Sequence, residues 1–236
     1  MMRALIVDDE IYSREEMGAM LKETGEFLVL GKCADAPEAI QSINREKPDV
    51  LFLDIQMPVI NGFELLGMID EKVMPSVVFV TAYDAYALKA FEENALDYLL
   101  KPVEKERLAK TVEKLKKRFS EGVKPVFAGS DIKKVPCIHS SKIKLINVAE
   151  VEYVRSGEAG VHVICRDGEF YTDITLQVLE SKTNLVRCHK QFLINMDLVD
   201  EIIRRENMLA EIKTTSGRLV PVSRRCLKTL RRKWHF

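Results

Sequence analysis

The chain has 236 residues, of which 47% are hydrophobic and 31% are charged. This composition excludes a disordered or low-complexity chain, and no segment approaches the roughly 18 apolar residues that a membrane helix needs. The formal net charge is zero, but residues 1–120 carry 16 Lys and Arg against 22 Asp and Glu, whereas residues 121–236 carry 20 against 14. An acidic half followed by a basic half predicts two domains with different partners.

The beginning of the chain and its cysteines bear on its location. The sequence reaches Asp8 too early for the apolar core of a signal peptide, so we expect a cytoplasmic protein that does not insert into the membrane. The five cysteines are scattered, odd in number and never spaced as CxxC. This pattern favours reduced thiols over a disulfide framework or a zinc site.

The first half alternates short apolar runs with amphipathic stretches. The runs predict strands that are buried on both faces, at Ala4–Val7, Leu28–Gly31, Val50–Leu53, Val77–Val80 and Leu96–Leu100. The amphipathic stretches predict helices near 11–24, 36–46, 62–71, 85–93 and 104–118. Five such βα units within residues 1–120 predict an α/β domain with a doubly wound, five-stranded parallel sheet.

Residues 121–132 break this pattern and are typical of a linker. From 133 to 236 the sequence predicts a second, mostly β domain with strands at Val135–His139, Lys142–Ile146, Val151–Arg155, Val161–Cys165, Glu169–Thr172, Met208–Thr214 and Leu219–Val222. Ser-Gly and Asp-Gly pairs between several of these runs indicate hairpins. One helix is expected after Thr175, and a basic one from Ser223 to about Trp234.

Polar residues follow four of the five strands predicted in the first half. Asp8 and Asp9 follow the first strand, Asp54 the third, Thr81 ends the fourth and Lys101 follows the fifth. The carboxyl ends of parallel strands meet at one edge of a sheet, so these side chains should converge. Three converging carboxylates suit Mg²⁺, and a central carboxylate can attack phosphorus. Asp54 is the best nucleophile because its strand lies near the middle, with Thr81 and Lys101 placed to bind phosphoryl oxygens.

These residues also carry a family resemblance that covers residues 1 to about 120. The chain resembles the receiver domains of two-component response regulators in the strings Leu5-Ile6-Val7-Asp8-Asp9-Glu10, Leu53-Asp54-Ile55-Gln56-Met57-Pro58 with Asn61-Gly62, Val80-Thr81-Ala82 and Asp97-Tyr98-Leu99-Leu100-Lys101-Pro102. The resemblance implies that Asp54 accepts a phosphoryl group from a sensor histidine kinase. It implies a Mg²⁺ ion held by Asp9, Asp54 and the backbone carbonyl of Gln56, with Asp8 assisting through water.

The resemblance further implies a switch. Lys101 would pair with the phosphoryl oxygens, and the Lys101–Pro102 bond would be cis. Thr81 and Tyr98 match the family's switch pair: the phosphoryl group draws in the Thr81 hydroxyl, and Tyr98 turns inward. The simpler interpretation of Tyr98 is a half-buried aromatic residue of a strand.

The second half contains no nucleotide-binding glycine loop and no metalloprotease or serine-hydrolase motif, so an enzymatic output is not expected. The chain here resembles the LytTR DNA-binding domain in the strings Leu185-Val186-Arg187-Cys188-His189-Lys190-Gln191-Phe192-Leu193-Ile194-Asn195 and Val220-Pro221-Val222-Ser223-Arg224-Arg225. The resemblance implies that Lys190 and Arg224 reach double-stranded DNA. Further candidates are Arg225, Arg155 and His189, although His189 could equally have a structural role.

The order of the two domains predicts a non-enzymatic, phosphorylation-controlled transcription regulator. The strings Pro48-Asp49-Val50-Leu51-Phe52-Leu53-Asp54-Ile55-Gln56-Met57-Pro58, Lys89-Ala90-Phe91-Glu92-Glu93 and Leu185-Val186-Arg187-Cys188-His189 resemble especially the pyruvate-responsive BtsR (YehT) subgroup of that family. This resemblance implies a membrane histidine kinase as partner. Phosphorylation is expected to favour a homodimer through residues 84–118. Two alternatives stay open: a phosphatase of the haloacid dehalogenase class, although Asp8-Asp9-Glu10 lacks its DxD spacing, and a receiver with a protein-binding β module.

Overall fold

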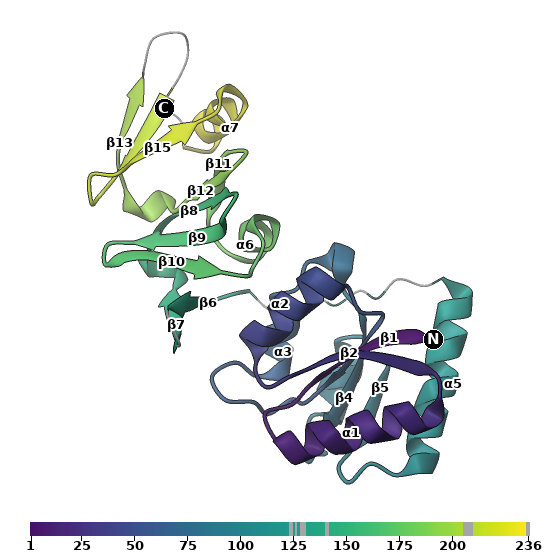
Figure 1. Ribbon diagram of the computed structural model, residues 1–236. Helices are drawn as coiled ribbons and strands as arrows, with labels where there is room; N and C mark the ends of the chain where they lie inside the picture. Colours follow the sequence, from purple (N-terminus) through teal and green to yellow (C-terminus); the bar gives the residue numbers. More distant parts are fainter. Residues whose placement is uncertain (123–124, 126, 128–130, 140–141, 205–209, 235–236) are drawn as a thin grey trace. The chain divides into compact units, whose positions relative to one another are not determined.

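The structure, a computed structural model, describes all residues except 123–124, 126, 128–130, 140–141, 205–209 and 235–236 (Figure 1). It contains two compact units, Met1–Ser130 and Asp131–Phe236. The predicted boundaries at 120 and 133 lie on either side of this division and stay predictions. In the described residues, no helix combines the length and apolarity needed to cross a bilayer.

The first unit is built on five parallel strands in the order β2-β1-β3-β4-β5, which confirms the predicted sheet. The strands are β1 (Met2–Val7), β2 (Phe27–Cys33), β3 (Val50–Leu53), β4 (Ser76–Thr81) and β5 (Asp97–Leu100). Every residue of β3 and β4 is buried, as expected for strands covered on both faces. The chain order reverses between β1 and β3, and such a point is where ligands bind in open α/β sheets.

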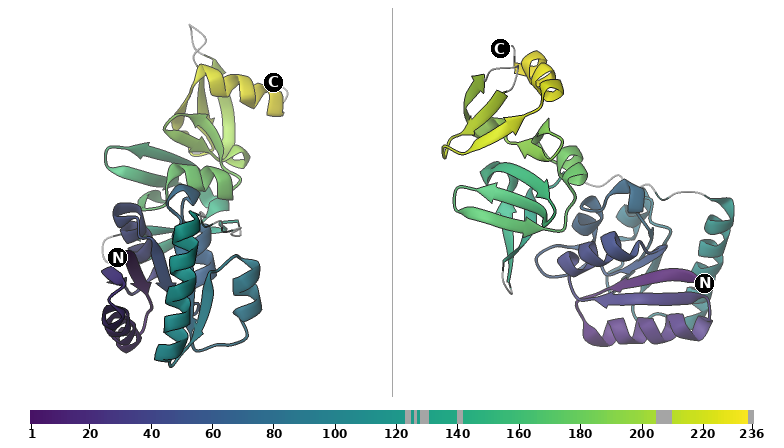
Figure 2. Two further views of the ribbon diagram at one scale, coloured as in Figure 1. Left: turned by 90° about the vertical axis from the view of Figure 1, so that its right-hand side faces the viewer. Right: turned by 45° about the horizontal axis from the view of Figure 1, so that its top comes forward.

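The helices of this unit cover both faces of the sheet (Figure 2). They are α1 (Ile11–Thr24), α2 (Ala36–Glu46), α3 (Gly62–Gly67), α4 (Ala87–Glu92) and α5 (Lys105–Glu121). On one face, Met17 and Leu21 of α1 and Leu108 and Leu115 of α5 pack against alternate strand residues such as Phe52. The predicted third helix is too long, since a separate 3-10 turn occupies Glu71–Val73.

A buried carboxylate fixes α5 to β5. The Asp97 side chain is fully buried and accepts hydrogen bonds from Arg107 Nη1 at 2.8 Å, Lys114 Nζ at 2.9 Å and Thr111 Oγ1 at 2.7 Å. Burial alone would raise the pKa of Asp97, but these donors and the backbone N–H of Tyr98 hold it well below its usual range. The start of β5 is thereby fixed against α5, one residue before Tyr98.

The second unit is mostly antiparallel β, as predicted. A seven-stranded sheet has the order β11-β12-β8-β9-β10-β6-β7, and a three-stranded sheet has the order β13-β14-β15. The strands are β6 (Lys134–His139), β7 (Lys142–Asn147), β8 (Val151–Gly157), β9 (Gly160–Cys165), β10 (Gly168–Thr172), β11 (Val186–His189), β12 (Phe192–Ile194), β13 (Val199–Arg204), β14 (Ala210–Thr214) and β15 (Leu219–Val222). The helices are α6 (Leu176–Lys182) and α7 (Arg224–Trp234).

Three strands of this unit, β11, β12 and β13, were not predicted from periodicity. Strands β11 and β12 have only four and three residues, and the six residues of β13 place two acids and then two isoleucines in succession, so none of the three shows a clear alternation. The beginning of the strand predicted from Met208 lies outside the described residues, and β14 starts at Ala210. Ile212 and Val220 of the small sheet pack with Leu227 and Leu230 of α7, which anchors the basic helix to the unit.

Candidate functional site

The acidic residues predicted to converge do so at the carboxyl ends of β1 and β3. One carboxylate oxygen each from Asp8, Asp9 and Asp54 lie within 4.8 Å of one another. Asp8 and Asp54 are 3% and 6% exposed, whereas Asp9 is exposed. Carboxylates this close repel one another unless a positive charge lies nearby.

Lys101 supplies a positive charge to this cluster. Its Nζ atom lies 2.8 Å from Asp54 Oδ2 and 2.7 Å from Asp8 Oδ2. Burial lowers the pKa of Lys101, but the hydrogen bonds and charges of Asp54 and Asp8 outweigh burial and raise it above its ordinary value. The Lys101–Pro102 peptide bond is cis, as the family resemblance implied.

The first turn of α1 holds Asp8 in place. Ser13 Oγ donates to Asp8 Oδ2 at 2.6 Å, the backbone N–H of Glu10 donates to Asp8 Oδ1 at 3.0 Å, and Arg14 Nη1 donates to the Asp8 carbonyl. The sequence analysis missed Ser13 and Arg14. Their spacing of five and six residues after Asp8, at the start of a predicted helix, could have indicated that they turn back toward it.

The loop after Asp54 depends on a glycine. A Cβ atom on Gly62 would lie 2.4 Å from the Asp54 carbonyl oxygen, so α3 could not begin this close to β3 with any other residue. The N–H of Gly62 donates to the Ile55 carbonyl at 2.8 Å. Asn61 and Glu64 form a reciprocal capping box that fixes the start of α3. These contacts hold the loop that contains Gln56.

A cavity of about 420 Å³ opens beside Asp54, and Asp9, Gln56, Tyr83 and Lys101 are among its lining residues. Thr81 ends β4 next to Ala82, which also lines the cavity. The Thr81 hydroxyl is buried and has no hydrogen-bond partner among the described residues. An unpaired buried hydroxyl costs free energy, so Thr81 Oγ1 is a group suited to an incoming polar ligand.

Tyr98 lies inward and is 8% exposed, so it is buried rather than half-buried. Its hydroxyl donates to the carbonyl of Tyr83 in the loop after β4. Burial, with smaller contributions from Asp84 and Asp54, raises the pKa of Tyr98 to about 12, so the hydroxyl keeps its proton at neutral pH. Tyr98 thus connects β5 to the loop that follows Thr81.

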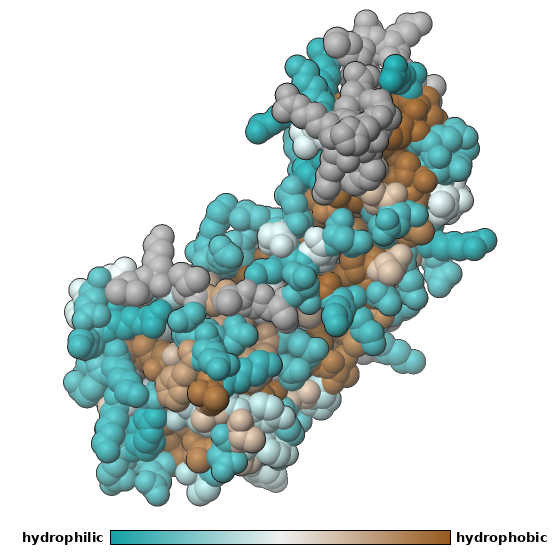
Figure 3. Space-filling view, turned by 180° about the vertical axis from the view of Figure 1, so that it is seen from behind, coloured by the Kyte–Doolittle hydropathy of each residue, from teal (hydrophilic) through white to brown (hydrophobic). Residues whose placement is uncertain are grey.

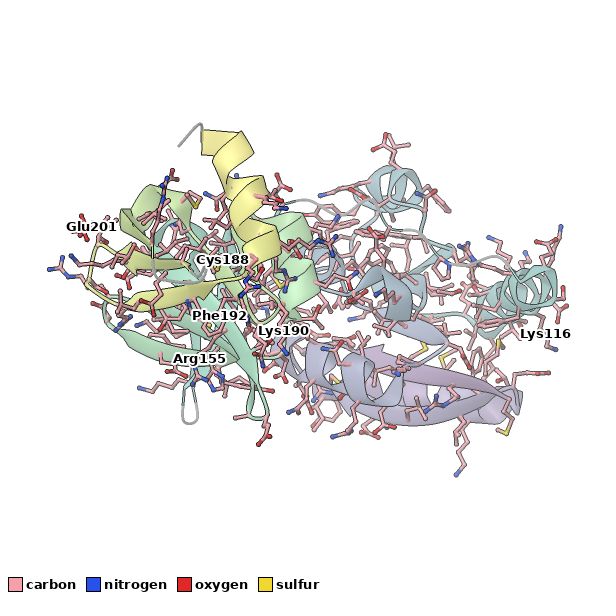
Figure 4. The ribbon with its side chains drawn as sticks, turned by 90° about the horizontal axis from the view of Figure 1, so that it is seen from above. Lys116, Arg155, Cys188, Lys190, Phe192 and Glu201 are labelled. Carbon is pink, nitrogen blue, oxygen red and sulfur yellow. The ribbon has the colours of Figure 1, made fainter. Side chains whose placement is uncertain are left out.

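The second candidate site lies in the second unit, where backbone hydrogen bonds join three segments. The N–H of Ser156, in β8, donates to the Gln191 carbonyl at 2.8 Å, and the N–H of Ser223 donates to the Cys188 carbonyl at 2.9 Å. Figure 4 shows Arg155, Phe192 and Lys190 within this unit. The structure therefore brings together the segments that contain Arg155, Lys190 and Arg224.

The predicted DNA-binding residues differ in their exposure and in whether their side chains already contact other residues of the unit. Lys190, Arg224 and Arg225 are exposed, and the last two begin α7. Arg155 is instead ion-paired with Glu169 of β10. His189 Nδ1 accepts the N–H of Gln191 at 3.3 Å, so one nitrogen of His189 is engaged in the turn between β11 and β12.

The five cysteines are free, and four of them are buried. Burial raises the pKa of the Cys188 thiol to about 12, with a smaller contribution from Cys226. The Cys188 thiolate is therefore scarce at neutral pH, and the side chain behaves as a small apolar group below the turn.

Comparison with known proteins matches both units. Residues 4–113 match the response regulator receiver domain, and residues 141–235 match the LytTr DNA-binding domain. A response regulatory protein of Vibrio cholerae is 49% identical over 98% of both chains, and the transcriptional regulatory protein BtsR of Escherichia coli is 44% identical over 98% of both chains. The solved REC domain of AraT from Geobacillus stearothermophilus is 32% identical, with a TM-score of 0.47, and covers 51% of this chain and 97% of that one.

Both relatives match along almost the entire chain, and the two domain families occur in the same order as the two units of the structure. The second family supplies a DNA-binding output. The chain belongs to the LytTR-type response regulators of two-component systems, which control transcription, and within them to the BtsR subgroup.

Proposed function

We propose that Asp54 accepts a phosphoryl group from a membrane sensor histidine kinase, and that this event controls promoter binding by the second unit. The observation that carries the proposal is the arrangement around Asp54: a lysine ammonium at 2.8 Å, two further carboxylates and, beside one cavity, a buried Thr81 hydroxyl that has no partner in the part of the chain that the structure describes. Each of these groups can bind either the phosphoryl oxygens or the metal ion when Asp54 is phosphorylated.

In the transfer, a carboxylate oxygen of Asp54 bonds to phosphorus while the phosphorus–nitrogen bond of the kinase phosphohistidine breaks, and the electron pair stays on the imidazole. Lys101 pairs with one phosphoryl oxygen, and Thr81 donates its hydroxyl to another. Asp8 keeps Lys101 near the reacting oxygen through its contact at 2.7 Å. The proton on Lys101 stays in place throughout.

The donor set around Asp54 fits Mg²⁺, because three carboxylates offer hard oxygen ligands within 4.8 Å of one another beside an open cavity. Asp9, Asp54 and the backbone carbonyl of Gln56 would hold the ion, with Asp8 assisting through water. The ion would neutralise phosphoryl charge.

The switch follows from Thr81 and Tyr98. A Thr81 hydroxyl drawn to the phosphoryl group moves the loop that contains Tyr83, whose carbonyl accepts the Tyr98 hydroxyl. This movement favours one arrangement of α4, β5 and α5 over another. In the region 84–118, the apolar side chains of Leu88, Phe91 and Leu100 are 73%, 53% and 46% exposed. Figure 3 shows hydrophobic surface, in brown, on the first unit. A homodimer through this region would bury them.

The second unit binds double-stranded DNA through the exposed cations Lys190, Arg224 and Arg225, whose segments are joined by backbone bonds. Arg155 and His189 are secondary contacts. In a dimer, the second unit of each chain would then bind one of two half-sites in the promoter.

The test uses the full chain, acetyl phosphate and Mg²⁺. Intact-protein mass spectrometry should show one added phosphoryl group in the wild type and none in Asp54→Ala. Glu92→Ala, on α4, is the control and should accept phosphate normally. Equal phosphorylation of Asp54→Ala would remove Asp54 from its role. Sustained turnover of phosphomonoesters would favour the phosphatase alternative, because the proposed function is not enzymatic.

A further inference from the structure

Arg187 belongs to the basic run that also contains His189 and Lys190, but its charge has a partner within the unit. Its Nε atom donates to Glu180 Oε2 of α6 at 2.9 Å, and Nη2 contacts the same oxygen. Nη2 also lies 3.5 Å from the Leu176 carbonyl, and Nη1 donates to the Lys190 carbonyl at 3.2 Å. One guanidinium therefore joins β11, α6 and the turn between β11 and β12.

That turn, residues 189–191, presents the exposed side chains of Lys190 and Gln191. Its backbone is held on one side by Ser156, whose N–H donates to the Gln191 carbonyl at 2.8 Å. On the other side, Arg187 donates to the Lys190 carbonyl. The bond between Gln191 N–H and His189 Nδ1 closes the turn internally. Arg187 is the link in this set that reaches α6.

The geometry requires arginine. The guanidinium is planar and presents its donors in a fixed fork, so it can satisfy a carboxylate on one edge and a carbonyl on the other. A lysine ammonium keeps the charge but cannot make these contacts together. The Arg187 side chain is 25% exposed and the Glu180 side chain 40%, so part of the pair lies away from bulk water.

We propose that Arg187 and Glu180 are positioning residues for DNA recognition: they hold the 189–191 turn so that Lys190 and Gln191 meet base edges. Arg187 itself does not bind phosphate. This inference rests on the proposed DNA-binding function of the second unit. It predicts an effect on sequence selectivity, because base contacts depend on side-chain placement, whereas phosphate contacts depend mainly on charge.

The experiment measures binding of the full chain to two labelled duplexes over a series of salt concentrations. One duplex is selected by the wild type from a randomised library, and the other is a scrambled sequence of the same composition. Arg187→Lys should weaken binding to the selected duplex about tenfold and binding to the scrambled duplex less than about twofold. Glu180→Ala should act in the same direction. Arg166→Lys, at an exposed arginine in the turn between β9 and β10, and Glu150→Ala are the matched controls.

A direct phosphate role for Arg187 makes opposite predictions. Arg187→Lys would then bind both duplexes almost as the wild type does, and Glu180→Ala would bind both more tightly because an acid is removed and Arg187 is released. Either result overturns the proposal. So does an equal loss on both duplexes accompanied by a lower melting temperature, since that indicates a general loss of fold. If the wild type selects no duplex at all, the proposed DNA-binding function fails, and the positioning role fails with it. If the wild type selects a duplex but Arg187→Lys and Glu180→Ala keep full selectivity, the positioning role alone fails.

Discussion

The two candidate sites are built in opposite ways. Apart from the exposed Asp9, the site around Asp54 consists of buried or half-buried groups at the ends of parallel strands, and Lys101 contacts Asp8 and Asp54 at 2.7 and 2.8 Å. The candidate DNA-binding site consists of exposed side chains on a turn and at the start of a helix, and backbone hydrogen bonds hold the segments that present them. Chemistry at phosphorus needs a few groups held together away from water, whereas reading a long polyanion needs several cations directed outward.

This contrast predicts how each unit responds to substitution. In the first unit, removal of a buried charge leaves its partners unmatched, so changes should be large and should affect folding as well. In the second unit, removal of an exposed cation should reduce affinity and leave folding unchanged. The predictions below go from the largest expected effect to the smallest.

Asp97→Ala should lower the free energy of unfolding of the first unit by about 3 kcal/mol, since Arg107, Lys114 and Thr111 lose a fully buried acceptor. Urea denaturation at pH 7 measures this loss, with the exposed Glu92→Ala as control. A change as small as that of the control would show that the buried charge is not what joins β5 to α5.

The lowered pKa of Asp97 also predicts how the free energy of unfolding depends on pH. Because the folded-state pKa of Asp97 lies below its unfolded value of about 3.9, its contribution is complete above that value and is lost as the pH falls toward the folded-state pKa. The difference in unfolding free energy between wild type and Asp97→Ala should therefore shrink below about pH 4. A difference that stays constant from pH 7 to pH 3 would contradict the assignment.

Lys190→Ala and Arg224→Ala should each weaken binding to a selected promoter duplex by about 1–3 kcal/mol without changing the melting temperature. Fluorescence anisotropy measures the affinity. Lys142→Ala is a matched control, because Lys142 is an exposed lysine of β7, at the edge of the sheet opposite to β11. Equal losses for Lys142→Ala and Lys190→Ala would show that only net charge matters.

Arg155→Ala should have the smallest effect, less than about 0.5 kcal/mol, because Arg155 is already paired with Glu169 and its removal also frees that acid. The same anisotropy assay compares it with Lys190→Ala. A loss as large as that of Lys190→Ala would mean that Arg155 leaves Glu169 to reach DNA.

Much of the first unit could be predicted from the sequence. Buried parallel strands give continuous apolar runs, and the polar residue after each run, such as Asp54 or Lys101, falls at one edge of the sheet by topology alone. What the apolar runs do not indicate are contacts made by side chains outside them, for which the only signal is a spacing such as that of Ser13 from Asp8. Ser13 contacts Asp8 only because α1 starts directly above the sheet edge.

The second unit was less predictable, because short antiparallel strands give weak periodicity. Arg187 and Lys190 lie three residues apart in one basic stretch of the sequence, but only the structure shows that Arg187 is paired with Glu180 and that Lys190 is exposed. Likewise, nothing in the sequence indicates that Arg155 of β8 pairs with Glu169. Glu169 lies on β10, which is separated from β8 by the strand β9. Ion pairs between side chains of different strands and helices therefore decide which cations are available to bind DNA.

The most direct test of the account measures promoter affinity with and without acetyl phosphate and Mg²⁺, in wild type and in Asp54→Ala, with phosphate incorporation checked in each sample. We expect phosphorylation to raise the affinity of the wild type and to leave that of Asp54→Ala unchanged. An equal rise in Asp54→Ala, or a fully phosphorylated wild type with unchanged affinity, would contradict the claim that Asp54 controls the DNA-binding unit.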